Sequence, residues 1–412
     1  MSVKSNSLSR LFNPSRKGFA FNSAILMMGR WVSYGFGALS IFLFAQLTAP
    51  SVYGQFTFLS SLFDIFIIVT LPGMSAALVR AVSRGYEGTV HVVSRKRFIG
   101  ALAGSVILLG CFGYYALVQK NPALAVGTLV AAVVFPFHYS LINYESVLIG
   151  KQAFPAYTAY TTASTVTGSI AIMGTLLLTK SFVVPFIAKT VLACVFAGWA
   201  YGRVTKGLKP DVDPDAISYG MRLTSLNVIS ILASKGELLI IPLFFSFDSL
   251  AFFYVAERAA SEFKFMWTTV SNQMLTKLAP LSIAEAFKKA VYRLPTVLVV
   301  FALMASLAGL SASILFPLLL TERYLPAIAL TQMMLLASVL SLTGAYFETY
   351  LISQKLITQL VLLRFVFPVS YLVLLPLLAY WQGMMGIVYA KMVAGATYSA
   401  SAALLAYRER SR

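Results

Sequence analysis

YGMRLTSLNVISILASKGELLIIPLFFSFDSLAFFYVAERAASEFKF, residues 219–265, is the stretch that decides the fold. It holds two consecutive hydrophobic spans, and both carry charged side chains, among them Lys235 in the first and Arg258 in the second. A charge near the bilayer centre costs roughly 2.5–3.5 kcal/mol on insertion scales unless it faces a bundle interior or a water-filled cavity. Charges in two successive spans therefore predict a polar interior, for which the rest of the chain forms a frame.

The composition is that of a polytopic membrane protein. Of the 412 residues, 59% are hydrophobic and only 11% are charged, and the mean hydropathy is +0.81. A soluble globular protein carries roughly 25% charged residues. Because every hydrophilic segment is short, we expect no extramembrane domain. Cys111 and Cys194 both lie in apolar spans and are interpreted as inert small hydrophobic residues.

The fold class expected is all-α, with about twelve transmembrane helices. A spanning helix needs roughly 20 apolar residues. The predicted spans lie at about 18–47, 54–82, 98–118, 123–149, 156–179, 183–203, 217–246, 250–276, 294–320, 326–353, 356–380 and 384–407. The first span follows a basic tail, but it is too long for a signal-peptide core and is interpreted as a retained helix.

The distribution of basic residues supports this count. With a cytoplasmic N-terminus, the inside segments hold 20 of the 32 Lys and Arg residues, whereas the outside segments hold three. This asymmetry is typical of a membrane protein whose two termini are both cytoplasmic. The net charge of +18 then reports topology and contact with anionic lipid headgroups, and no nucleic-acid partner is expected.

The longest polar gap, residues 204–216, predicts a cytoplasmic linker between an N-terminal lobe (1–203, helices 1–6) and a C-terminal lobe (217–412, helices 7–12). Six spans on each side are typical of transporters built from repeats. The linker contains a D-x-D pair, Asp211 and Asp213, but no catalytic domain surrounds it, and Asp215 is interpreted as the N-cap of the seventh span. A second cytoplasmic segment, 281–293, predicts a short amphipathic helix at the membrane surface.

Charged residues inside the spans are the candidates for function. The cations outnumber the acids by three. They are Arg30, Arg80, Lys189, Arg222, Lys235, Arg258, Lys264, Arg364 and Lys391, against Asp64, Glu145, Glu237, Glu257, Glu262 and Glu348. A bound anion would balance this surplus, and a phosphate or diphosphate suits the planar donor fork of Arg and the point charge of Lys.

Each candidate also has a simpler interpretation. Arg80 and Arg222 lie near cytoplasmic ends and can extend to the interface, and Arg258 and Glu262 are spaced to pair along one helix. Arg30 and Lys235 lie deepest and are the strongest candidates for lining a polar cavity. The acids Asp64, Glu145, Glu237 and Glu348 are candidates for proton or sodium coupling, or for structural hydrogen bonds. No metal site and no cofactor are expected, and no nucleotide-binding loop is present.

Residues 47–85, LTAPSVYGQFTFLSSLFDIFIIVTLPGMSAALVRAVSRG, resemble the first repeat of polysaccharide (O-antigen-type) flippases. These belong to the multidrug/oligosaccharidyl-lipid/polysaccharide (MOP) exporter superfamily. The matching features are Tyr53-Gly54 and the run from Gly73 to Arg80. In the second half, SYGMRLTSLNVIS, Tyr254-x-Ala256, Pro280 and ERYLPAIAL at 322–330 are similar to the family's pattern, and Glu237 stands where the family often has an aspartate.

The resemblance implies two six-helix lobes of the MOP/MATE type around a central cationic cavity. It implies a transporter, not an enzyme, that moves an undecaprenyl-diphosphate-linked oligosaccharide to the outer leaflet of the bacterial inner membrane by alternating access. The implied partners are that lipid-linked substrate, membrane lipids, and the polysaccharide polymerase and chain-length proteins of O-antigen, capsule or exopolysaccharide biosynthesis. The candidate cavity residues are Arg30, Arg80, Arg222, Lys235, Arg258, Lys264, Arg364 and Lys391, and those for coupling or charge balance are Asp64, Glu145, Glu237, Glu262 and Glu348.

Two alternatives stay open. An ion-coupled multidrug or small-solute antiporter of the same superfamily would need an acidic cavity that attracts cations, and the cationic surplus argues against it. A membrane polysaccharide polymerase or ligase would need a sizeable outer loop, whereas every predicted outer segment is short.

Overall fold

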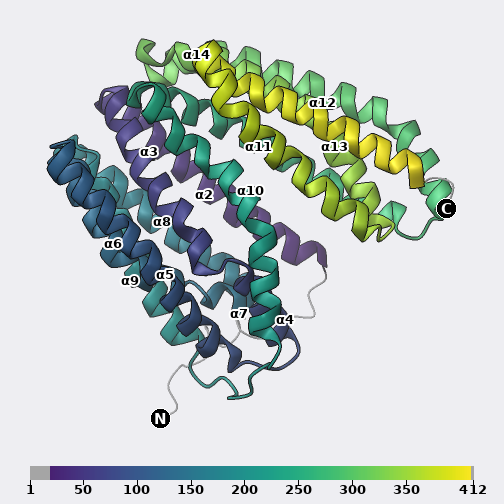
Figure 1. Cartoon of the computed structure of the whole chain (residues 1–412), viewed down its shortest axis with the longest axis horizontal. Helices are drawn as coiled ribbons and strands as arrows, with labels where there is room; N and C mark the ends of the chain where they lie inside the picture. Colours follow the sequence, from purple (N-terminus) through teal and green to yellow (C-terminus); the bar gives the residue numbers. More distant parts are fainter. Residues whose placement is uncertain (1–18, 410–412) are drawn as a thin grey trace. The chain divides into compact units, whose positions relative to one another are not determined.

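The computed structural model describes residues 19–409, and this part of the chain is helical without any strand (Figure 1). The predicted all-α fold class is therefore confirmed. The α-helices are α2 (Phe19–Leu47), α3 (Pro50–Ile65), α4 (Gly73–Ser83), α5 (Thr89–Gly113), α6 (Pro122–Leu141), α7 (Tyr144–Gly150), α8 (Phe154–Thr179), α9 (Val183–Val204), α10 (Ala216–Phe244), α11 (Phe247–Leu278), α12 (Ile283–Leu320), α13 (Pro326–Ser353) and α14 (Ile357–Glu409). Short helical turns η1 (Phe66–Thr70), η2 (Tyr114–Val118) and η3 (Glu322–Tyr324) join some of them.

The chain forms two compact units. Unit 1 comprises residues 1–48 and 59–228, and unit 2 comprises residues 49–58 and 229–412. Helices α3 and α10 contribute residues to both. The predicted lobe boundary at 204–216 stays a prediction.

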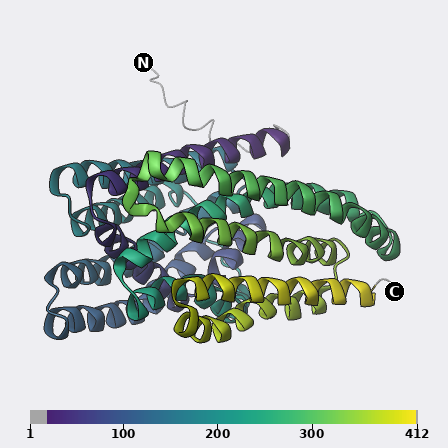
Figure 2. The ribbon, with the colours of Figure 1, turned by 90° about the horizontal axis from the view of Figure 1, so that it is seen from above.

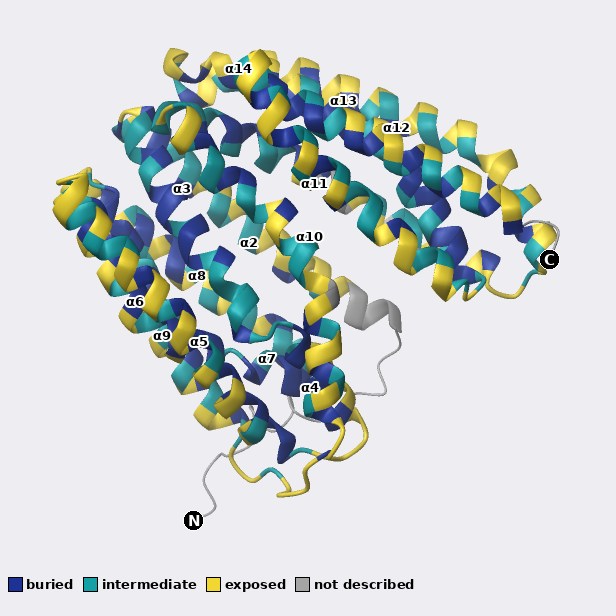
Figure 3. Ribbon diagram, in the orientation of Figure 1, coloured by how far each residue is buried: buried dark blue, intermediate teal, exposed yellow. Residues whose placement is uncertain are grey.

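The predicted spans all fall on helices. Within residues 19–409, ten helical stretches are long and apolar enough to cross a membrane. The count differs from twelve because α11 carries too many charges to qualify and because α14 contains two limbs. Large apolar side chains such as Val106, Leu178 and Ile314 are exposed on the outer faces of their helices, and Figure 3 shows such exposed residues along α6 and α12. Lipid in place of water explains why these side chains face outward.

Two helix breaks shape unit 1. Helix α3 runs into η1, which is followed by Leu71 in the left-handed conformation (φ 58°) and by Pro72, the N-cap of α4. Helix α6 ends at Leu141, and α7 starts two residues after Ile142. At the start of α4, the backbone N–H of Gly73 donates to Thr224 Oγ1 of α10 at 3.1 Å. A Cβ at Gly73 would collide with the α10 backbone. Glycine at this position therefore permits close contact of α4 with α10.

Arg97 joins these two breaks. Its side chain is only 2% exposed, and its guanidinium donates to the carbonyl of Thr70 (3.1 Å), to Ser75 Oγ (3.0 Å) and to Asn143 Oδ1 (2.6 Å). Helix α5 begins at Thr89, so Arg97 lies inside this helix and its side chain is buried in unit 1.

Helix α14 in unit 2 turns back on itself. Gly383 has φ 65° and ψ −145°, and a Cβ at Gly386 would collide with the backbone of Leu378. The two limbs lie side by side, as Figure 2 shows, with the rings of Phe367 and Tyr398 6.3 Å apart. The predicted spans 356–380 and 384–407 correspond to these limbs. The predicted separate helix at 281–293 is instead the beginning of α12, capped by Ser282 and Glu285.

The predicted linker is anchored to unit 1. The backbone N–H of Lys209 donates to the Glu87 carboxylate at 3.1 Å, and Lys151 Nζ lies 2.9 Å from the same carboxylate. Asp213 Oδ1 accepts the N–H of Asp215 at 3.0 Å. Asp213 is buried in this turn and its N–H donates to Thr89 Oγ1, which gives it a structural role. Asp215 directly precedes α10 and its carbonyl accepts the N–H of Tyr219 at 3.0 Å, which is the position predicted for the N-cap.

The anchoring of the linker should depend on pH. Burial raises the pKa of Glu87, but the hydrogen bonds from Lys151 and from the Lys209 N–H outweigh it and hold this pKa below the usual 4.5. A depressed folded-state pKa stabilises the fold above the unfolded value and loses this contribution as the pH falls from 4.5 through the folded value. Hydrogen exchange at Lys209, corrected for the intrinsic rate, should therefore rise on acidification from about pH 6 to about pH 3.

The control is Glu87→Gln, in which exchange at Lys209 should be fast already at neutral pH and show no acid step. Protection that persists unchanged in the acidified native protein would contradict the anchoring role of Glu87.

Candidate functional site

A buried cluster of ionisable side chains connects three helices of unit 2. Lys391 Nζ, from the second limb of α14, lies 2.9 Å from Glu237 Oε1 on α10 and 3.1 Å from Glu257 Oε2 on α11. The Tyr371 hydroxyl, from the first limb of α14, donates to the other oxygen of Glu237. Two carboxylates therefore share one ammonium group.

This cluster is shielded from its surroundings. The side chain of Glu237 is 1% exposed and that of Lys391 is 12% exposed. The ammonium also lies 4.9 Å from the ring centroid of Phe253, where cation–π attraction favours it. Glu257 is more open, with 28% of its side chain exposed. The cost of burying the Glu237 carboxylate in a low-dielectric interior is offset by its contacts with Lys391 and Tyr371.

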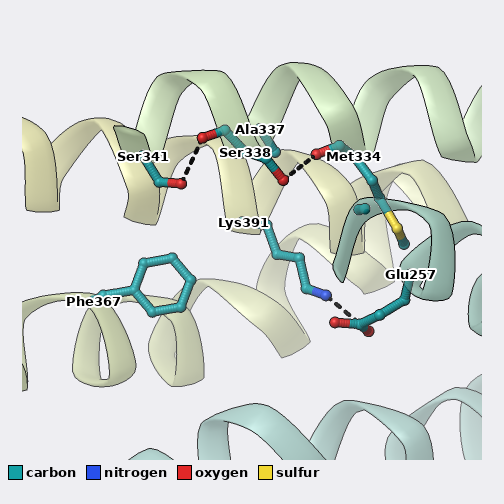
Figure 4. A pocket seen from close by; sticks show the side chains of 8 residues that line it. Glu257, Met334, Ala337, Ser338, Ser341, Phe367 and Lys391 are labelled. Atoms are coloured by element: carbon teal, nitrogen blue, oxygen red, sulfur yellow. Dashed lines mark hydrogen bonds and ion pairs between the residues drawn. The ribbon is translucent and has the colours of Figure 1, made fainter. Parts of the chain in front are cut away.

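The cluster borders a small pocket with a cavity volume of about 20 Å³. Figure 4 shows Lys391 and Glu257 on one side, Ser338 and Ser341 of α13 on the other, and the ring of Phe367 nearby. Both serine hydroxyls donate within α13, to the carbonyls of Met334 and Ser338 respectively. Their lone pairs are left to accept hydrogen bonds, so the pocket can accommodate water or a polar group next to the ion pair.

A second ionic group lies on the other side of Phe367. Glu348 Oε1 lies 3.4 Å from Arg364 Nε, and Glu348 Oε2 accepts a 2.6 Å hydrogen bond from Tyr398. The Phe367 ring lies 5.8 Å from that of Tyr371 and 6.3 Å from that of Tyr398. The two groups are therefore connected by aromatic packing within unit 2.

The remaining candidates of unit 2 are arranged differently. Lys235 and Arg258 are half-buried neighbours of the cluster in sequence, two residues before Glu237 and one after Glu257. The side chains of Glu262 and Lys264 lie outside the described residues, so the predicted pairing of Arg258 with Glu262 stays a prediction.

In unit 1 the candidate cations are exposed on the surface of the chain. Arg30 donates from Nε to the Tyr34 hydroxyl at 2.8 Å. Arg80 lies over the Tyr219 ring, 4.8 Å from its centroid, and Arg222 is exposed on α10. Their placement in a cavity stays a prediction.

The two candidate acids of unit 1 are partly buried. Asp64 Oδ1 lies 3.5 Å from the Tyr139 hydroxyl, which can donate to it, and Glu145 lies in the first turn of α7. Within residues 24–409, apart from the few side chains left undescribed, no three His, Cys, Asp or Glu side chains are grouped to hold a metal ion. The assignment of Asp64 and Glu145 to ion coupling stays a prediction.

Sequence reasoning missed Tyr371 and Arg97, and it left Glu257 out of the candidate site. Tyr371 is uncharged and lies in an apolar span, so a search for charges passes over it. Arg97 was hidden in a run of cations. Glu257 carried a usable signal, because it lies within the eighth predicted span, where an isolated charge needs a partner.

Three solved structures of membrane transporters are similar to the chain in fold. The chain is similar in fold to an inward-facing multidrug resistance MATE family transporter of the MOP superfamily (TM-score 0.68, 12% identity, 91% of this chain and 95% of that one). It is similar to the lipid II flippase MurJ in an inward closed conformation (TM-score 0.68, 13% identity, 93% and 87%). A third similar structure is a MOP superfamily transporter from Pyrococcus furiosus (TM-score 0.61, 12% identity, 98% and 99%). No curated protein sequence matches the chain.

The chain belongs to the polysaccharide biosynthesis protein family, whose sequence pattern matches residues 43–329. Together with the fold, this match confirms the predicted resemblance to MOP-type polysaccharide flippases, and the helices are those of a multi-pass membrane protein.

Removal of the shared ammonium should destabilise the protein. In Lys391→Met, Glu237 and Glu257 lose their cation while remaining close together, and breaking a buried ion pair costs roughly 3–5 kcal/mol. Denaturant unfolding of the purified protein in detergent should detect this loss, and adding Glu237→Gln should recover part of it.

The matched control is Arg364→Met. Arg364 also pairs with a glutamate, but its side chain is 66% exposed, so the loss should stay within about 1 kcal/mol. Equal effects of the two Met substitutions would show that burial of the Lys391 pair contributes nothing.

Proposed function

We propose that the protein is a flippase that moves an undecaprenyl-diphosphate-linked oligosaccharide from the cytoplasmic to the outer leaflet by alternating access. The observation that carries the proposal is the match of residues 43–329 to the polysaccharide biosynthesis protein family. The transporter fold supports it, because a membrane-spanning helical protein with polar groups inside offers a route for a charged headgroup.

The chemistry of the substrate agrees with the charges inside the spans. A diphosphate is best held by Arg and Lys, and the predicted spans contain a surplus of these residues over acids. Arg30 and Lys235 are the proposed cavity contacts, with Arg80, Arg222, Arg258, Lys264 and Arg364 as further candidates. Lys391 has a different role, because it is engaged by two carboxylates in unit 2.

We propose a proton as the coupling ion, with the cluster of Glu237, Glu257 and Lys391 as its site. The ammonium lies within 3.1 Å of both carboxylates and so fills the position that a sodium ion would take between them. We assign the proton to Glu237, whose buried carboxylate is held by both Lys391 and Tyr371. Gain and loss of that proton would change the contacts of Tyr371 and Lys391 with Glu237, and therefore the packing of α10 against α14.

The biological setting follows from the family. We propose a bacterial inner-membrane location with both termini cytoplasmic, and a role in O-antigen, capsule or exopolysaccharide biosynthesis. A polysaccharide polymerase and chain-length proteins would then use the exported units. The likeness to MATE transporters favours one second candidate, an ion-coupled multidrug or small-solute antiporter.

Transport should depend on the deep cations. In liposomes with a fluorescent undecaprenyl-diphosphate oligosaccharide, exposure to an impermeant quencher should slow by roughly tenfold or more in Arg30→Ala or Lys235→Ala, because each loses a charge-assisted contact to phosphate. Lys206→Ala removes an exposed cation of the linker and should transport normally. Full-rate exposure in both cavity variants would refute their assignment, and no exposure in wild type would favour the antiporter.

Coupling should follow protons. An imposed proton gradient should accelerate wild-type transport, whereas a sodium gradient should not. In Glu237→Gln the side chain can no longer take up or release a proton, so the acceleration should disappear while exchange without a gradient persists. Glu322→Gln, at an exposed residue of η3, is the control. Acceleration by sodium, or an undiminished proton effect in Glu237→Gln, would contradict the proposed site.

A further inference from the structure

A second pocket of unit 2 is lined by three cations. Lys277 lies near the end of α11, and Lys289 and Arg293 lie one turn apart near the beginning of α12. The cavity volume is about 110 Å³, and no carboxylate is among the described residues that line it. It is distinct from the Glu237 cluster, with which it shares no lining residue.

The acid nearest in sequence is engaged elsewhere. Glu285 accepts hydrogen bonds from the backbone N–H and the hydroxyl of Ser282 at 3.3 and 2.9 Å, which closes the capping box of α12. None of the ion pairs formed by the described residues includes Lys277, Lys289 or Arg293. Three cations around one hollow without an acidic partner repel one another unless an anion binds between them.

The walls of the pocket are apolar on both sides of the cations. Val270, Met274 and Leu278 contribute from α11, and Val297 contributes from α12. Tyr346 of α13 completes the lining, and its hydroxyl is fixed by donation to the Ala290 carbonyl at 2.9 Å. A soluble anion gains no stabilisation from contact with apolar side chains, whereas a lipid carries an apolar chain attached to its phosphate.

The length of the helices places the pocket at the depth of lipid headgroups. Helix α12 has 38 residues and spans roughly 57 Å at 1.5 Å per residue, which exceeds the hydrocarbon thickness of about 30 Å. Its most apolar part follows Leu294, so the turns that carry Lys289 and Arg293 extend past the hydrocarbon. Lysine and arginine at this depth contact anionic headgroups.

We propose that this pocket is a binding site for a lipid-borne phosphate, with Lys277, Lys289 and Arg293 around the phosphate and the lipid chain along Val270, Met274 and Val297. The ligand chemistry, a phosphate ester on an apolar chain, has two membrane sources, an anionic phospholipid and a polyprenyl diphosphate. The proposal does not depend on transport activity, since it concerns binding alone.

Quenching of tryptophan fluorescence by brominated lipids tests the site. The chain has four tryptophans, and the Trp267 ring lies 5.9 Å from that of the pocket-lining Tyr346. The other three, Trp31, Trp199 and Trp381, are exposed and can be replaced by Phe. In phosphatidylcholine vesicles, the full-length protein with Trp267 alone should be quenched by brominated phosphatidylglycerol at a lower mole fraction than by brominated phosphatidylcholine.

Two variants separate a site from general surface charge. Lys289→Gln with Arg293→Gln should weaken the preference for phosphatidylglycerol by about fivefold for each cation removed. Lys288→Gln removes an exposed cation that does not line the pocket, and should keep the preference. Absence of any preference, or equal losses in Lys288→Gln and in a single Lys289→Gln variant, would overturn the proposal.

Competition identifies the source of the phosphate. Displacement of brominated phosphatidylglycerol by unlabelled undecaprenyl diphosphate at a much lower mole fraction than by unlabelled phosphatidylglycerol would assign the site to the polyprenyl lipid. Comparable displacement by both would assign it to membrane phospholipid. Equal displacement by inorganic phosphate would show a soluble-anion site and refute the lipid-borne ligand. Because none of these readouts measures flipping, they can fail or succeed independently of the proposed transport function.

Discussion

The ion pairing of Lys391 with Glu237 and Glu257 is the constraint on which the interior of unit 2 depends. A charge buried in a membrane helix is tolerated only when a partner satisfies it, and here one ammonium satisfies carboxylates from two other helices. The requirement places α10, α11 and both limbs of α14 around one point. The tight turn at Gly383 makes this possible, because it brings Tyr371 and Lys391 of the same helix to the same glutamate.

In unit 1 a buried charge is satisfied by neutral partners. Arg97 is as deeply buried as Glu237, yet its hydrogen bonds go to a carbonyl, a hydroxyl and an amide. The helix breaks after Thr70 and before Tyr144 supply these groups, since a broken helix leaves backbone oxygens without intrahelical donors. The cation and the breaks therefore stabilise one another. A buried cation held by dipoles keeps its charge, whereas one held by two acids creates a place where a proton can be exchanged.

The sequence predicted the helices well because hydropathy depends on local composition. The turn between the predicted spans 356–380 and 384–407 is Gly383, and the charged span 250–276 is α11. It predicted the partners poorly, because pairing depends on tertiary contacts. Lys235 and Lys391 are equivalent in a list of intramembrane cations, and nothing in such a list indicates that Lys391 lies between two carboxylates. Tyr371 carries no charge to mark it, and Arg97 follows two other cations, so neither could be recognised before α5 and α14 were placed.

The charge surplus of the spans was interpreted as a sign of one anion-binding interior, yet the structure of unit 2 separates two electrostatic environments. Around Glu237 two carboxylates already engage the Lys391 ammonium, which makes this place unsuited to a further anion. Around Lys289 the cations have no acid among the lining residues, which favours phosphate. A cation that contributes to the positive-inside asymmetry can also belong to a binding site. Cations at the headgroup depth become a site when the helices that carry them enclose a hollow, as α11, α12 and α13 do here.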